Sequence, residues 1–106
     1  MTVKDKDSLL PDQKLTKIWH KAWEEGIWLQ IVDGTSGHCM AAAGSLRELK
    51  KFGAAVERWA CRNIRKNKLK LGDCINLGAV PGVGRTPEAA CRAAIGSLKK
   101  ELKNRG

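Results

Sequence analysis

Apolar side chains near the start of the chain recur at the spacing of one helix face. Within residues 12–25 they stand at i, i+3, i+4, i+7 and i+8, which predicts an amphipathic α-helix. Asp12 is placed to cap its first turn, and Gly26 is a natural stop. Residues 1–11 are expected to form a flexible leader before it. The apolar positions of this helix are Leu15, Ile18, Trp19, Ala22 and Trp23.

Short runs of a different kind predict β-strands. Residues 27–32 are rich in β-branched and aromatic side chains and are followed by an Asp-Gly pair, which is typical of a strand leaving through a tight turn. Residues 37–43 are expected to return as a second strand. Residues 68–71 alternate polar and apolar side chains and are joined to residues 74–77 by a Gly-Asp pair, which predicts a hairpin with a type II′ turn.

The middle of the chain, from Ser45 to about Lys66, predicts one long helix with two contrasting sides. Ser45 followed by Glu48 has the form of a capping box. Gly53 inside the helix costs roughly 1 kcal/mol relative to Ala, and a close approach of another backbone would explain it. At 100° per residue, the apolar side of this helix collects Leu46, Leu49, Gly53, Val56, Ala60 and Ile64, widened by Phe52, Ala55 and Trp59.

Positive charge collects on the other side of that helix. Arg47, Lys51, Arg58, Arg62 and Arg65 fall within about 60° of one another, and Lys68 and Lys70 extend the stripe. The net charge is +9, and residues 45–70 hold nine Lys or Arg against two Glu. This asymmetry points to an acidic partner, which is nucleic acid, an acidic protein or an anionic membrane surface. Arg suits bidentate contacts to phosphate or carboxylate, and a plain solvated helix face is the alternative.

A Gly-rich segment, residues 78–86, precedes the last predicted helix. Its outer glycines are separated by five residues where a P-loop has four, and Arg85 replaces the required Lys, which excludes P-loop hydrolysis. Gly82, Gly84 and the following helix N-terminus are candidates to hold one anion with the help of Arg85, and a flexible turn is the alternative. Thr86 is expected to cap that helix, with Pro and Glu in its first turn. Its apolar stripe is Cys91, Ala94, Ile95, Leu98 and Leu102.

The order of these elements is helix, strand, strand, helix, two strands, helix. It predicts an α+β fold in which a small antiparallel sheet of three or four short strands carries three helices packed on one face. At 106 residues, the chain is expected to form one domain over residues 12–106.

Catalytic and metal-binding patterns are weak. The four cysteines include no CxxC pair, so buried free thiols are favoured over a scattered zinc site that includes His38. His38 and Cys39 are adjacent, so on a strand they would point to opposite faces, which argues against a nucleophilic pair. Trp19, Trp23 and Trp59 lie on apolar helix faces and are expected in the core, whereas Trp28 is either core or a stacking platform for a base. We expect no enzyme activity, metal or cofactor.

The stretch of residues 84–98, G-R-T-P-E-A-A-C-R-A-A-I-G-S-L, resembles the closing segment of small phage-encoded accessory domains of the phage ABA-sandwich type. This resemblance covers about a seventh of the chain and implies a bacteriophage or prophage origin and a small α+β domain, with no established chemistry. The matching residues are Gly84, Thr86, Pro87, Ala90, Cys91, Arg92, Ala93 and Ala94.

These patterns together predict a small, basic, non-enzymatic binding protein that contacts nucleic acid or a nucleic-acid-processing complex. The alternative is an inhibitor or adaptor that binds an acidic surface of a host protein. The sequence contains no run of about 18 apolar residues that would predict a membrane span, and its first residues do not resemble a secretory signal. The expected location is therefore the cytoplasm. If the protein is phage-encoded, this is the cytoplasm of a bacterial host cell. The candidate partner-binding residues are Arg47, Lys51, Arg58, Arg62, Arg65, Lys68, Lys70 and Arg85.

Overall fold

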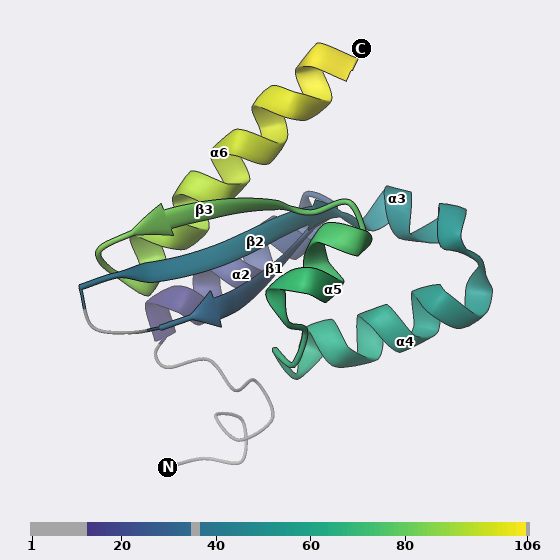
Figure 1. Cartoon of the computed structure of the whole chain (residues 1–106), viewed down its shortest axis with the longest axis horizontal. Coiled ribbons are helices and arrows are strands. Elements are labelled where there is room, and N and C mark those ends of the chain that lie inside the picture. Colours follow the sequence, from purple (N-terminus) through teal and green to yellow (C-terminus); the bar gives the residue numbers. More distant parts are fainter. Residues whose placement is uncertain (1–12, 35–36, 106) are drawn as a thin grey trace.

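A three-stranded antiparallel sheet, in the order β1-β2-β3, forms the middle layer of the protein. The computed structural model describes residues 13–34 and 37–105, and Figure 1 shows their arrangement. The elements along the chain are α2 (Gln13–Glu24), β1 (Ile27–Asp33), β2 (Cys39–Ser45), α3 (Leu46–Leu49), the 3-10 turn η1 (Lys50–Phe52), α4 (Ala54–Arg65), α5 (Leu71–Asn76), β3 (Val80–Gly84) and α6 (Pro87–Arg105).

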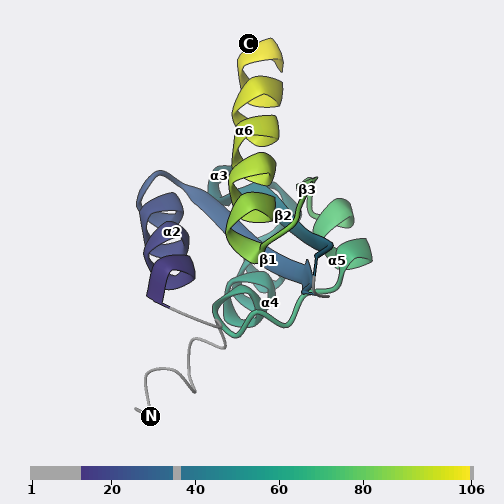
Figure 2. The same cartoon turned by 90° about the vertical axis from the view of Figure 1, so that its left-hand side faces the viewer.

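Helices cover both faces of the sheet, so the α+β class is confirmed but the expectation of helices on one face is wrong. Ile27 and Leu29 of β1 pack with α2 and α6, whereas Trp28 lies in a second core with residues of α3, α4 and α5. Figure 2 shows α2 and α6 on one side of the strands and α4 and α5 on the other. Residues 27–30 are all buried, and continuous burial is typical of a strand that is covered on both faces. The structure also has more helices than the three expected.

The two predicted helices that flank the sheet on its α2–α6 face are confirmed. α2 covers residues 13–24 of the expected range, while Asp12 and the expected leader lie outside the described residues. α6 begins as predicted, because the hydroxyl of Thr86 accepts a hydrogen bond from the Ala89 N–H at 3.1 Å. β1 and β2 also form, although β2 runs two residues later than expected, over Cys39–Ser45.

The Gly-rich segment before α6 is an edge strand, not a loop. Its glycines allow α6 to approach the sheet: a Cβ on Gly82 would collide with the backbone of Ala94, and one on Gly84 would lie 2.7 Å from the Ala90 nitrogen. Gly82 is buried against the helix. These glycines therefore serve close packing of α6 on the sheet. The anion-holding loop and the flexible turn both place them in a loop, whereas residues 80–84 form β3.

The long helix expected in the middle of the chain is broken at Gly53. This residue has φ +100° and ψ 158°, a conformation that is essentially restricted to glycine, and it ends η1 and begins α4. A Cβ there would meet no atom within 4 Å, so the expected close backbone approach is wrong. The expected capping box is wrong as well, because the Ser45 side chain makes no capping hydrogen bond.

The hairpin expected over residues 68–77 is instead the short helix α5. Cys74 and Leu77 are buried and Ile75 between them is exposed. A spacing of three residues places Cys74 and Leu77 on one face of a helix, whereas on a strand they would point to opposite faces. At the first turn, the Asp73 carboxylate accepts a hydrogen bond from the Lys70 backbone N–H at 3.3 Å. Asp73, expected in a turn, thus helps to begin the helix.

Candidate nucleic-acid interface

The helix α4 is fixed to the sheet by one narrow apolar side. Ala60 and Ile64 are fully buried in the core that includes Trp28 and Leu49, whereas Arg58, Arg62 and Arg65 are exposed. The amphipathic pattern of the sequence therefore locates both sides of this helix correctly in its second half.

A buried glutamine fixes the C-terminal end of α4. Gln30 of β1 is fully buried, and its Nε2 donates hydrogen bonds to the carbonyls of Leu29 at 2.6 Å and Ile64 at 2.9 Å. Its Oε1 accepts a hydrogen bond from the Leu69 N–H at 3.0 Å. Because an unpaired buried amide is costly, this arrangement ties β1, α4 and the segment after α4 together.

The side chain of Asn67 also ties the segment after α4 to β1. Asn67 has a positive φ of 53°, which asparagine tolerates better than most residues, and its Oδ1 accepts a hydrogen bond from the Ile31 N–H at 2.9 Å. Lys66, Lys68 and Lys70 lie on the chain that these contacts fix, and all three are exposed. These hydrogen bonds therefore fix the backbone of residues 66–70, which carries the three lysines.

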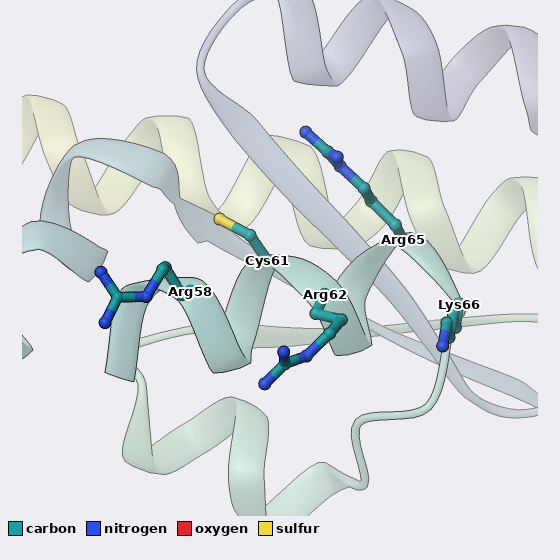
Figure 3. A pocket seen from close by; sticks show the side chains of 5 residues that line it. All are labelled: Arg58, Cys61, Arg62, Arg65 and Lys66. Carbon is teal, nitrogen blue, oxygen red and sulfur yellow. The ribbon is translucent and has the colours of Figure 1, made fainter. Parts of the chain in front are cut away.

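An open hollow of about 600 Å³ lies along α4 (Figure 3). In this view the guanidinium groups of Arg58, Arg62 and Arg65 spread apart from the helix instead of converging on one point. A diverging set of cations suits an extended polyanion better than a single bound phosphate. The residues that line the hollow are Arg58, Cys61, Arg62, Arg65 and Lys66.

Two neighbours modify the chemistry of this hollow. The Arg65 guanidinium lies over the ring of Trp23 in α2, 5.6 Å from its centroid, which is a cation–π contact. Burial raises the pKa of the Cys61 thiol, Glu57 raises it further, and Arg65 opposes them. Cys61 is therefore protonated at neutral pH and is not an activated nucleophile.

The remaining candidate residues lie elsewhere. Arg47 and Lys51 line a separate hollow near the end of α2, together with Lys99 of α6. This second hollow also contains acids: Lys51 pairs with Glu48 at 3.6 Å, and Lys99 pairs with Glu25 at 3.1 Å.

Arg85 lines neither of the two hollows. It follows β3, whose last residue Gly84 pairs with Cys39 at the beginning of β2, whereas α3 leaves from Ser45 at the other end of β2. Arg85 is exposed, and it lies at the opposite end of β2 from α3 and therefore from Arg47.

Three exposed apolar residues on and before α4 were expected in the core. Phe52, Val56 and Trp59 have exposed fractions of 45%, 37% and 41%, so the prediction that they face inward is wrong. The break at Gly53 leaves Phe52 outside α4 and allows α4 to turn independently of α3. Trp28, in contrast, is fully buried against Gly44 of the neighbouring strand, which identifies it as a core residue.

The cysteines are free thiols. Cys39, Cys74 and Cys91 are buried and Cys61 is half-buried. Burial raises the pKa of Cys74 to about 12 and that of Cys91 to about 11. Within residues 13–34 and 37–105, no three His, Cys, Asp or Glu side chains gather closely enough to hold a metal ion.

Comparisons of the chain with protein-family models, with curated proteins and with solved structures found no match. Among the described helices, none combines the length and apolar character needed to cross a membrane.

Proposed function

We propose that this protein is a small, non-enzymatic module that binds nucleic acid through α4 and the segment that follows it. The binding surface, called the α4 basic surface below, comprises Arg58, Arg62, Arg65, Lys66, Lys68 and Lys70. Arg47 and Lys51 are left out of it because they lie in a mixed-charge hollow, and Arg85 is left out because it follows β3 and lines neither hollow.

The observation that carries the proposal is an exposed run of unopposed positive charge. Residues 58–70 contain six Lys or Arg and no Asp or Glu, and all six basic side chains belong to exposed residues. Among the described residues, no ion pair joins any of the six to a carboxylate. Phosphate groups supply the anions that such a surface lacks, and displaced counterions add to the binding free energy.

A second candidate function is docking on an acidic surface of a host protein, as an inhibitor or adaptor. The exposed Phe52, Val56 and Trp59 favour it, because aromatic residues and Arg are enriched at the energetic centres of protein interfaces. Such a partner would be captured as one protein at a fixed stoichiometry, and nuclease treatment would not release it.

The origin and location belong to the same proposal. We infer a phage or prophage source from the resemblance of residues 84–98, and hence the cytoplasm of a bacterial host as the place of action. Nucleic acid is accessible to a small basic protein in that compartment.

The direct test reverses two charges of the α4 basic surface. Arg58→Glu with Arg62→Glu should abolish binding to mixed-sequence DNA and RNA at about 150 mM salt, while the circular dichroism spectrum and melting temperature stay close to wild type. Affinity of the wild type should fall with salt, with a log–log slope of about −4 to −5 if six phosphates are neutralised. Heparin should compete with both nucleic acids.

A matched control separates a local surface from a general charge effect. Arg92→Glu with Lys103→Glu changes the net charge by the same amount on α6, where both residues are exposed. This control should retain most of the binding. Equal losses in the two double variants, or a wild type that binds neither DNA nor RNA at that salt, would contradict the proposal.

A further inference from the structure

Trp59 is the feature of α4 that a purely electrostatic surface does not explain. Its exposed fraction is 41%, whereas Trp28 is fully buried. Burial of a tryptophan ring removes up to 150–250 Å² from water, so leaving it exposed forgoes a large stabilisation. The attachment of α4 to the sheet does not need this ring, because Ala60 and Ile64 provide the buried contacts.

The helical spacing of α4 places Trp59 next to its basic side. At 100° per residue, Trp59 lies about 60° from Arg62 around the helix, and Lys66 follows directly after the last residue of α4. Its neighbour one turn later, Asn63, donates a side-chain hydrogen bond back to the Trp59 carbonyl at 2.8 Å. The amide of Asn63 is therefore directed at the helix backbone and not across the exposed side of Trp59.

We propose that Trp59, with Arg62 and Lys66, forms a stacking platform for an unpaired base, and that the α4 basic surface prefers single-stranded nucleic acid to duplex. This inference rests on the proposed function and names its substrate class. In a duplex the faces of the bases are stacked on one another, so an indole on a helix surface meets only sugar and phosphate. A single strand offers base faces for stacking and phosphates for the surrounding cations.

The charges and their arrangement favour this occupant over a protein. Six cations without an acid between residues 58 and 70 match a chain that carries one negative charge per nucleotide. The guanidinium groups of Arg58, Arg62 and Arg65 spread in different directions (Figure 3), which a flexible strand can follow. Aromatic rings combined with a positively charged groove bind single strands without strong sequence preference. Trp59 does not line the hollow, but it belongs to the same helix as the three arginines that do.

The experiment compares Trp59→Ala, Trp59→Phe and the wild type on two probes at equal salt. The probes are a labelled oligothymidylate of about 20 nucleotides and a blunt duplex of similar length, with fluorescence anisotropy as the readout. The wild type should bind the single strand more tightly. Trp59→Ala should weaken single-strand binding about 5- to 150-fold, which corresponds to the loss of one stacked base. It should change duplex binding less than about twofold, and its single-strand salt slope should match wild type, since no cation is removed.

Two further variants keep the test decisive. Trp59→Phe retains an aromatic face and should keep most of the single-strand affinity, even if Trp59→Ala folds poorly. Val56→Ala removes an exposed apolar group from the same helix without removing an aromatic ring, and it should have no effect. Saturation with oligothymidylate should quench the intrinsic tryptophan fluorescence of the wild type, and Trp59→Phe should lose this change.

The outcomes distinguish the inference from the proposed function. If Trp59→Ala weakens both probes equally or neither probe, or if Val56→Ala matches it, the stacking platform is wrong while the basic surface stands. If Arg58→Glu with Arg62→Glu leaves binding to both probes unchanged, the proposed function fails with it. Stoichiometric capture of one nuclease-resistant protein partner, with no binding to either probe, would overturn both.

Discussion

The two faces of the sheet are built differently. On one face, the long helix α6 lies directly on β2 and β3, with glycines and alanines at the contact and a short spacing between backbones. On the other face, α3 and α5 are short, and a glycine with a positive φ breaks the path between α3 and α4. The uninterrupted face is closely packed, and the interrupted face presents an exposed basic helix to solvent.

Polar contacts show the same difference. The core beneath α6 is formed by apolar side chains such as Leu29, Ala94 and Leu98, and at its edge the Trp19 indole N–H donates one hydrogen bond to the Leu29 carbonyl at 3.2 Å. The core beneath α4 includes Gln30, whose amide joins three backbone groups from β1, α4 and the following segment. Hydrogen bonds of this kind specify where a segment lies more narrowly than apolar contacts do. The face that presents the candidate site is thus held by directed bonds.

The largest effect is expected on the α6 face. Gly82→Ala places a methyl group against the backbone of Ala94, so α6 must move away from β3. We expect a loss of about 3 kcal/mol in the free energy of unfolding, measured by urea denaturation. Gly72→Ala in α5, where a Cβ meets nothing within 4 Å, is the control and should be neutral or slightly stabilising. A cost below about 1 kcal/mol for Gly82→Ala would contradict the close packing.

A somewhat smaller effect is expected when the amide beneath α4 is removed. Gln30→Leu keeps the side-chain size but leaves the buried Leu69 N–H without its acceptor, whereas the Ile64 carbonyl loses one hydrogen bond and keeps that from the Asn67 N–H. We expect a loss of about 2 to 3 kcal/mol in urea denaturation. Nucleic-acid affinity should also fall, because the segment with Lys66, Lys68 and Lys70 loses an anchor. Gln13→Leu, at an exposed position of α2, is the matched control. If Gln30→Leu bound nucleic acid with unchanged affinity, the hydrogen bonds of Gln30 would not be needed for binding.

Alkaline pH is expected to weaken both faces through their buried thiols. The folded pKa of Cys91, about 11, is above the ordinary value of 9.0, so the folded state keeps a proton that the unfolded state releases. This contribution to stability is complete below pH 9 and is lost as pH rises from 9 toward 11, by about 2 kcal/mol. Urea denaturation at pH 8 and pH 10.5 should show it. Cys91→Ala should make the decline shallower, and an identical decline in that variant would contradict the assignment.

The smallest effect is expected at the break between α3 and α4. Gly53→Ala places a Cβ on a backbone at φ +100°, where only glycine is unstrained. The expected loss is about 1 to 2 kcal/mol, measured by urea denaturation. Gly96→Ala in α6, where a Cβ meets nothing within 4 Å, should instead be neutral or stabilising. A more stable Gly53→Ala variant with higher helix content would mean that the two helices join into the single helix that the sequence pattern predicts.

The broad outline of the fold was predictable because it depends on local patterns. The apolar spacing of α2, the β-branched run of β1 and the Thr86 cap of α6 each reflect a preference expressed within a few residues. The cations of α4 were predictable for the same reason, since helical spacing alone places Arg58, Arg62 and Arg65 away from Ala60 and Ile64.

The exposure of Trp59 was harder to predict. On the uninterrupted helix it lies about 100° from the centre of the apolar stripe, at the boundary where either side is possible. The residue type favoured burial, whereas contacts of α4 with the sheet placed it outside. The one sign of this in the sequence was Gly53, eight residues after Ser45, because the helix pattern is interrupted at that glycine.

The sequence by itself determined which segments are amphipathic, where most of the positive charge lies and where α6 begins, because these follow from neighbours along the chain. Tertiary structure alone decided that helices cover both faces, that residues 71–76 form α5 and that Gly82 serves a helix–strand contact. It also separated Arg47 and Lys51 from the α4 cations. Each of these depends on which distant surfaces pack together, and residues far apart along the chain carry no local sign of that packing.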